Sequence, residues 1–252
     1  MPELPPLTIA ATLRWDVVSR LLPAGAQDVL EVGCGQGAVG GRLAQRYPHY
    51  LGLEPDRASY EVARERVTAV GRGEVRNATF EALEQDEPGR DFDVVCAFEV
   101  LEHLEDDVAA LTAWAGRLRP GGTLVLSVPG YQHRLGPWDA MVGHYRRYDP
   151  PVLAERLRAA GLTGERVVHY GFPVGLALET ARNVVARRRA VTSPEGVAAG
   201  QEQERTATSG RLLQPARPLA ALAMRAAAAP WRPVQRRFPD RGITLVAVAH
   251  RP

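Results

Sequence analysis

An acidic residue followed by three alternating glycines stands out in the stretch VLEVGCGQGAVGG, as Glu31, Gly33, Gly35 and Gly37. Glycines at this spacing permit a tight turn between a buried strand and a helix, and they let a ligand approach the main chain closely. The same letters also fit the glycine pattern of a dinucleotide-binding turn. The loop alone therefore predicts a nucleoside ligand and leaves its identity open.

Glu31 distinguishes a dinucleotide from a nucleoside ligand that has no phosphate. A carboxylate in an otherwise apolar strand is costly unless it meets a cation or hydrogen-bond donors. The pyrophosphate of a dinucleotide is anionic, whereas S-adenosylmethionine has no phosphate and carries an ammonium group. Glu31 therefore favours S-adenosylmethionine. Glu54, at the end of the next expected strand, is placed to accept both ribose hydroxyls, which either ligand would need.

Composition narrows the class of protein. The 252 residues allow one sizeable α/β domain with an elaboration, or at most two small domains. A formal net charge of only +2 argues against a general nucleic-acid binder. The two cysteines, Cys34 and Cys96, do not make a disulfide framework. With no signal-peptide pattern and no stretch apolar enough to span a membrane, we expect a cytoplasmic protein.

Short apolar runs alternate with helix-like segments up to about residue 170, which is typical of a parallel sheet covered by helices. A final apolar run suggests that the chain returns to the same sheet. We expect strands at 28–33, 50–54, 73–78, 92–98, 122–129, 165–171 and 242–252. We expect helices near 37–47, 57–70, 106–118 and 151–160.

The alternation breaks at residues 172–238, which contain two Ala/Leu/Val-rich stretches separated by a polar run. We therefore divide the chain into a core of residues 1–171 plus 239–252 and a helical insertion of residues 172–238. Arg187 to Arg189 lie in the first of these stretches, and basic amphipathic helices can lie on anionic membranes. The insertion is predicted to be a lid, a dimer face or a membrane-contact element.

Three stretches in order, VLEVGCGQG, LGLEPD and FDVVCAFEVLEHLEDDVAALTAWAGRLRPGGTLVLSVPG, resemble the successive motifs of class I S-adenosylmethionine-dependent methyltransferases. The likeness is strongest to the small-molecule branch that includes ubiquinone-biosynthesis-type O-methyltransferases. It covers roughly residues 25–171 and the last strand. The resemblance implies a Rossmann-like seven-stranded sheet in the order 3-2-1-4-5-7-6, with strand 7 antiparallel and helices on both faces.

The resemblance also implies how S-adenosylmethionine is held. The three glycines line its methionine part, Glu31 holds its amino group, and Glu54 binds the ribose. A polar group and a main-chain amide face the adenine, and two further side chains flank the methyl donor. The expected cofactor contacts are Glu31, Gly33, Cys34, Gly35, Gly37, Glu54, Pro55, Thr79, Phe80, Phe98 and His103.

Methyl transfer is an in-line displacement, so the enzyme must mainly position the acceptor and exclude water. A hydroxyl acceptor also needs a base, and we expect this to be His144, which could instead order the lid. The segment 128–150 is expected to face the acceptor. Its predicted acceptor contacts are His133, Trp138, Tyr145, Arg146 and Arg147, of which the two arginines either clamp an anion or pair with a nearby acid.

No metal is expected, because Phe98 and Pro129 stand at the strand ends where the metal-dependent, catechol-type branch has acidic ligands. Nucleic acid is not expected as the acceptor, since FEVLEH replaces the motif of the amino-methylating DNA enzymes. The leading hypothesis is methyl transfer to a hydroxyl of a small-molecule or lipid-linked acceptor, which yields S-adenosylhomocysteine. The alternatives are an NAD(P)-dependent oxidoreductase and a non-catalytic adenosyl-binding module, and a homodimer remains open.

Overall fold

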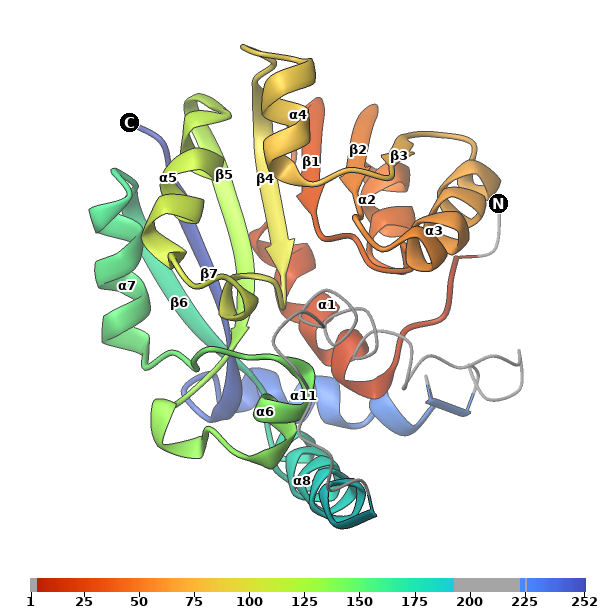
Figure 1. Ribbon diagram of the computed structural model, residues 1–252, viewed down its shortest axis with the longest axis vertical. Helices are drawn as coiled ribbons and strands as arrows, with labels where there is room; N and C mark the ends of the chain where they lie inside the picture. Colours follow the sequence, from red (N-terminus) through yellow and green to blue (C-terminus); the bar gives the residue numbers. More distant parts are fainter. Residues whose placement is uncertain (1–3, 193–222, 225) are drawn as a thin grey trace.

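Seven strands form one sheet in the order β3-β2-β1-β4-β5-β7-β6, as Figure 1 shows. The computed structural model describes residues 4–192, 223–224 and 226–252. Strands β1 to β5 pair in parallel, and β7 runs antiparallel to both β5 and β6. The predicted Rossmann-like order and the antiparallel last strand are confirmed. The strands are β1 (Asp28–Val32), β2 (His49–Leu53), β3 (Glu74–Arg76), β4 (Phe92–Phe98), β5 (Leu118–Pro129), β6 (Thr163–Gly171) and β7 (Gly242–His250).

Helices cover both faces of the sheet, and each face has its own hydrophobic core. One core joins the strands to α4 (Phe80–Asp86), α5 (Asp107–Gly116) and α7 (Pro150–Ala159). The other joins them to α1 (Ile9–Leu21), α2 (Gly40–Arg46) and α3 (Arg57–Val70). Apolar side chains on both faces of the strands explain their continuous hydrophobic runs, because a strand buried on both faces has no solvent side.

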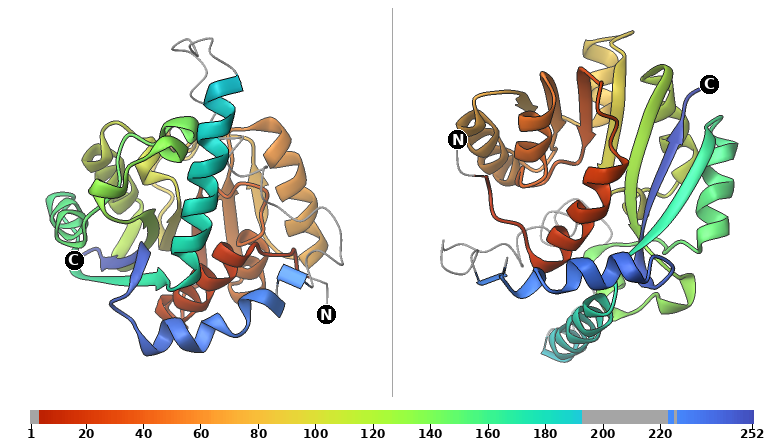
Figure 2. Two further views of the ribbon diagram at one scale, coloured as in Figure 1. Left: turned by 90° about the horizontal axis from the view of Figure 1, so that it is seen from below. Right: turned by 180° about the vertical axis from the view of Figure 1, so that it is seen from behind.

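Further helices gather at the end of the sheet to which β1, β4 and β5 point (Figures 1 and 2). They are α6 (Pro137–Val142), α8 (Val174–Thr192), α11 (Trp231–Arg237) and the short helices η1 (Leu101–His103) and η2 (Gln132–Arg134). Helix α8 packs against α6, β6 and β7, and α11 packs against α1. The described part of the insertion therefore covers the carboxyl edge of the parallel strands.

Buried Asp16 connects α1 to α11. Its carboxylate accepts hydrogen bonds from Arg232, Gln235 and Arg236, and Arg20 lies 3.2 Å away. Burial acts to raise the pKa of Asp16, but the hydrogen bonds from Arg236, Gln235 and Arg232 outweigh it and hold the pKa well below its usual value. This charge cluster fixes the position of the last helix before β7.

Several elements differ from expectation. Helix α1 was not predicted, because charged Arg14 and Asp16 lie among its inward-facing apolar residues and interrupt the periodicity. Helix α2 begins at Gly40 and not near Gly37, since Gly37 has a φ of +72°, which a right-handed helix cannot include. Most of the second Ala-rich stretch, 212–229, and almost all of the polar run, 192–210, lie outside the described residues.

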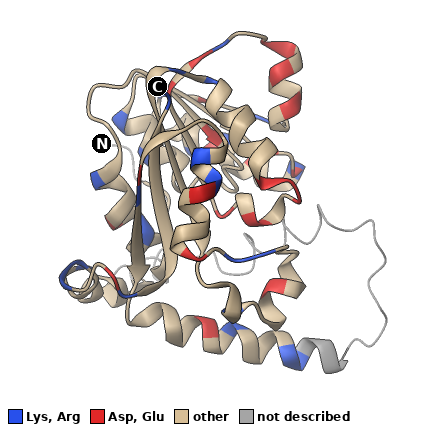
Figure 3. Cartoon of the chain, turned by 90° about the vertical axis from the view of Figure 1, so that its left-hand side faces the viewer, with Lys and Arg blue, Asp and Glu red and all other residues tan. Residues whose placement is uncertain are grey.

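Basic and acidic residues are interspersed along the chain in the view of Figure 3. This distribution agrees with the small net charge of +2 and differs from the single-sign face of a general nucleic-acid binder. Among the described helices, none combines the length and the apolar composition needed to cross a bilayer.

Candidate active site

The loop that joins β1 to α2 carries three glycines with positive φ, namely Gly33, Gly35 and Gly37. A Cβ on Gly37 would lie 2.9 Å from the Cα of Ala63, so only glycine fits there. A Cβ on Gly35 would meet no atom within 4 Å, because this residue borders open space. The loop is therefore closed on its protein side and open on the side where a ligand would lie.

Glu31 lies beneath this loop and is only 2% exposed. The hydroxyl of Tyr50, from β2, donates a 2.6 Å hydrogen bond to its Oε2. Burial raises the pKa of Glu31 to about 8, and the hydrogen bond from Tyr50 and the charge of Arg14 offset this effect only in part. The sequence argument required a donor or a cation at Glu31, and Tyr50 supplies one donor. An added cation would stabilise the ionised carboxylate further.

Glu54 lies against the same loop, from the end of β2. Its Oε2 accepts the main-chain N–H of Gly35 at 2.8 Å, and its Oε1 accepts that of Asp56 at 2.9 Å. The side-chain amide of Asn77 stabilises the turn by donating hydrogen bonds to the carbonyls of Glu54 and Pro55. Glu54 is thus placed beside the glycine loop, as a ribose ligand requires, and Asn77 is a positioning residue that sequence reasoning missed.

The remaining predicted cofactor contacts lie at the neighbouring strand ends. Thr79 caps α4 by accepting the N–H of Ala82, and Phe80 begins that helix and packs into the core. The side chain of Cys34 packs into the other core, while its N–H and carbonyl are bonded to Leu53 and Gly37. The side chain of Cys34 therefore has a packing role, and its main-chain groups hold the loop.

Arg14 of α1 reaches the end of β4 and was not predicted from the sequence. Its guanidinium lies 5.6 Å from the ring centre of Phe98, and its Nη1 lies 3.4 Å from Glu99. The Nε of Arg14 is buried without a hydrogen-bond partner among the described residues. A buried donor left without a partner costs free energy, so this group is suited to an anionic ligand group.

A cavity lies between the carboxyl ends of β4 and β5 and the helices α1, α6 and α8. Its charged and polar lining includes Glu99, Asp139, His144, Tyr170, Glu179 and Arg182. Trp138 and Arg147 also line it, and the guanidinium of Arg182 lies 5.6 Å from the Trp138 ring. A concave site with convergent polar groups beside the expected methyl donor is suited to hold the acceptor.

His144 has a fixed orientation in this cavity. Its Nδ1 lies 2.7 Å from Oδ1 of Asp139, which is itself held by Arg147 at 2.9 and 2.8 Å. Arg147 also bonds Glu179 of α8. Burial acts to raise the pKa of Asp139, but the hydrogen bonds from His144 and Arg147 outweigh it and lower the pKa. An ionised Asp139 holds His144 so that Nε2 points away from it.

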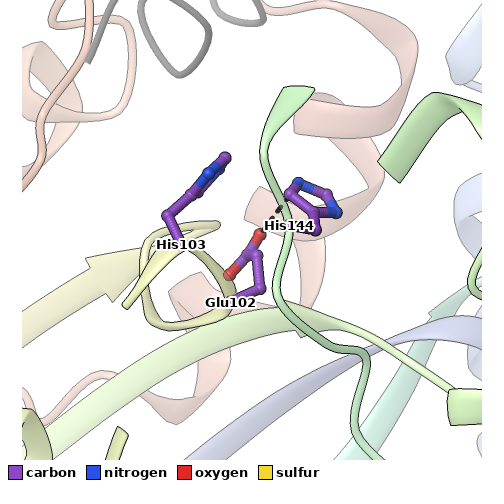
Figure 4. Close-up of side chains that lie close together, drawn as sticks. All are labelled: Glu102, His103 and His144. Carbon is purple, nitrogen blue, oxygen red and sulfur yellow. Dashed lines mark ion pairs between the residues drawn. The ribbon is translucent and has the colours of Figure 1, made fainter. Parts of the chain in front are cut away.

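The Nε2 side of the His144 ring lies near Glu102 and His103 (Figure 4). Its Nε2 is 3.8 Å from Oε1 of Glu102, and its ring is 4.7 Å from that of His103 with the planes nearly perpendicular. Burial and the neighbouring His144 lower the pKa of His103 to about 4. His103 therefore belongs to the same group of side chains as the predicted base.

Three predicted acceptor contacts lie outside the cavity lining. Tyr145 is 40% exposed, and His133 is exposed in η2. Arg146 forms an ion pair with Asp107 at 3.0 Å, so its charge is balanced by an acid of the protein. Arg147, although it lines the cavity, is likewise paired with acids. The structure thus groups Trp138, Arg147 and His144. Both arginines pair with acids, which is the second of the two alternatives expected, and Arg182 is a further cation in the lining.

Comparisons with known proteins agree with this arrangement. A family model described as a methyltransferase domain matches residues 9–167. A ubiquinone biosynthesis O-methyltransferase of Marinobacter nauticus is 32% identical over 175 residues, which cover 64% of this chain and 74% of that protein. An uncharacterised methyltransferase of Mycobacterium tuberculosis is 32% identical over 117 residues, which cover 46% of this chain and 58% of that one. The chain thus spans less than two thirds of several curated relatives that it matches.

A similar solved structure is the N-methyltransferase NodS of Bradyrhizobium japonicum, determined in complex with S-adenosyl-L-homocysteine. The TM-score is 0.54 at 16% identity, and the match covers 96% of this chain and 84% of that one. At this identity the likeness supports the fold. Because the family model covers more than half of the chain, this protein belongs to the methyltransferase-domain family.

Proposed function

We propose that this protein transfers the methyl group of S-adenosylmethionine to a hydroxyl oxygen of a small-molecule or lipid-linked acceptor. The observation that carries the proposal is the cavity beside the ends of β4 and β5, which is lined by His144 and by the Asp139 carboxylate that orients it. Family membership supports the class of reaction. Unlike an amine, a hydroxyl gains much of its rate from a base, and an oriented histidine in the cavity is suited to that role.

The cofactor lies across the ends of β1, β2 and β4 in this proposal. Its amino-acid part rests on the glycine loop, with the ammonium near Glu31 and the carboxylate paired with Arg14. Its ribose bonds Glu54, and its adenine lies at the start of α4. Phe98 and Arg14 then border the sulfonium, which presents its methyl group to the cavity.

The acceptor occupies the cavity beneath α8, which acts as a lid. Nε2 of His144 takes the proton from the hydroxyl as the oxygen–methyl bond forms and the sulfur–methyl bond breaks. Arg182 indicates the chemical class of the acceptor. Among the described residues the guanidinium contacts the Trp138 ring but no carboxylate, and burial lowers its pKa. We therefore expect an acceptor with an aromatic ring and an anionic group.

A transfer assay tests this proposal. The protein is incubated with tritiated-methyl S-adenosylmethionine and a panel of phenols and catechols, each with and without a carboxylate. The proposal expects labelled methyl ethers, with carboxylated acceptors favoured, and a loss of roughly 100-fold or more in rate for His144→Ala. His133→Ala is the matched control, because His133 is an exposed histidine of the same segment. S-adenosylhomocysteine binding without transfer to the panel or to cell extract would favour the non-catalytic module.

A further inference from the structure

We propose that Glu102, His103 and His144 bind one divalent transition-metal cation at the edge of the cavity. Each side chain offers one ligand atom, and these atoms all lie within 4.8 Å of one another. Ligands about 2.1 Å from a shared tetrahedral ion are separated by about 3.4 Å. Small rotations of the three side chains therefore suffice to close the site.

Glu102 gives the independent reason for a cation. Its side chain is fully buried, and neither carboxylate oxygen has a hydrogen-bond partner among the described residues. Figure 4 shows this carboxylate beside both histidines. Its Oε1 lies 3.8 Å from Nε2 of His144, which is too long for a hydrogen bond. A buried carboxylate without donors is costly, and the charge of a bound cation would offset that cost.

The outer partners of a metal site are already in place. Nδ1 of His144 is bonded to Asp139, which leaves Nε2 to face Glu102. The His103 ring makes a hydrogen bond to the main chain of Gly143. Metal-binding histidines characteristically use their second nitrogen in this way, since the bond fixes the tautomer and the ring orientation. Both rings are therefore oriented before any ion arrives.

The ligand set defines the class of cation. Two imidazoles and one carboxylate suit zinc, cobalt, iron or manganese, whereas magnesium and calcium prefer oxygen ligands alone. Three protein ligands leave a coordination position for another molecule. Because His144 also lines the cavity, this position is at the acceptor site. Sequence reasoning expected no metal because Phe98 and Pro129 stand at the ends of the fourth and fifth strands, whereas the triad lies further along the segments that follow those two strands.

The role of the cation, although not its binding, rests on the proposed function. When Nε2 of His144 is a ligand, the cation takes over the activation of the acceptor hydroxyl by lowering the pKa of that hydroxyl. The hydroxyl proton leaves to solvent, the oxygen–methyl bond forms as the sulfur–methyl bond breaks, and the sulfonium becomes the neutral thioether of S-adenosylhomocysteine. The protein loaded with metal thus needs no free histidine base.

The test titrates the full chain, dialysed against a chelator, with Zn²⁺ by calorimetry and with Co²⁺ by visible absorption. We expect one site per chain and tetrahedral or five-coordinate cobalt bands. Glu102→Gln, His103→Ala and His144→Ala should each weaken binding at least ~100-fold, and Asp139→Asn, which removes an outer partner, about tenfold. His133→Ala should bind as the unmodified protein does. Circular dichroism and S-adenosylhomocysteine binding confirm that each variant is folded.

Three results would overturn the proposal. They are no binding by the unmodified protein, binding that survives all three ligand substitutions, and binding of Mg²⁺ in preference to Zn²⁺ and Co²⁺. Absence of metal binding with intact S-adenosylhomocysteine binding removes this inference and leaves the proposed function standing, with His144 as the base. Metal binding without S-adenosylhomocysteine binding does the reverse.

Discussion

Glu31 should lose a proton when the cofactor binds. In the free protein, burial raises the pKa of this carboxyl group to about 8, so at pH 7 it is roughly 90% protonated. An ammonium group beside the carboxylate should return the pKa towards its ordinary value of 4.5. Binding at pH 7 then releases about 0.9 proton per chain.

The sign of the pH dependence follows from this release. Because the complex holds fewer protons than the free protein, raising the pH favours the complex. Affinity for S-adenosylhomocysteine should therefore rise roughly tenfold between pH 6 and pH 7. The cofactor ammonium remains charged over this interval, since α-amino groups titrate near pH 8 or above. The dependence therefore reports on Glu31 and not on the ligand.

Calorimetry in buffers of different ionisation enthalpy measures both quantities. Glu31→Gln should bind more weakly, release no proton and show no rise in affinity with pH. Glu61→Gln, at an exposed glutamate of α3, is the matched control and should retain both effects. If the unmodified protein binds with no proton release and with equal affinity at pH 6 and pH 7, the carboxylate does not meet the ammonium and our account of the loop is wrong.

Four further substitutions test other parts of the structure. Asp16→Ala should lower the free energy of unfolding by roughly 3 kcal/mol, measured by urea denaturation, because it removes the buried partner of α11. The pKa of Asp16 is depressed in the folded protein, so this contribution is present at neutral pH and should be lost as the pH falls below about 4. Gly37→Ala should cost at least ~1 kcal/mol through strain and contact with the neighbouring helix. Gly35→Ala should cost less stability than Gly37→Ala, because its positive φ adds strain but its Cβ meets no atom, and it should also impair S-adenosylhomocysteine binding because that Cβ points into open space. Asp139→Asn should reduce transfer about tenfold or more while leaving S-adenosylhomocysteine binding intact, and an unchanged rate would show that His144 needs no orienting carboxylate.

Local sequence accounts for most of the sheet because most strands are apolar runs that can be recognised without knowing their neighbours. Phe92–Phe98 is apolar except for Asp93 and is buried on both faces, and its predicted bounds agree with the structure. Helix α3 likewise agrees at Arg57–Val70, since Asp56 caps its start and Gly71 ends it. Helix α1 shows the limit of this reasoning, because Asp16 is stabilised by arginines more than 200 residues away in the chain.

The loop and its acids could be recognised from the sequence for a similar reason. The conformation of Gly37 and the strand-end positions of Glu31 and Glu54 depend on residues close by in the chain, which fix where the backbone turns. The partners of these acids depend on the fold. Tyr50 meets Glu31 only because β1 and β2 are adjacent, and this neighbour changes how the buried carboxylate is stabilised.

The sequence by itself determined the strand pattern, the glycine turn and the class of ligand, because short-range sterics and hydrophobic periodicity encode them. Only the tertiary structure decided the composition of the cavity that we propose for the acceptor. It paired Arg146 and Arg147 with acids, left Arg182 facing the cavity, and brought His144 to Glu102 and His103. Side chains from separate segments meet only when the whole chain packs. An arginine prefers an acidic partner, but the sequence does not specify which acid will lie within reach.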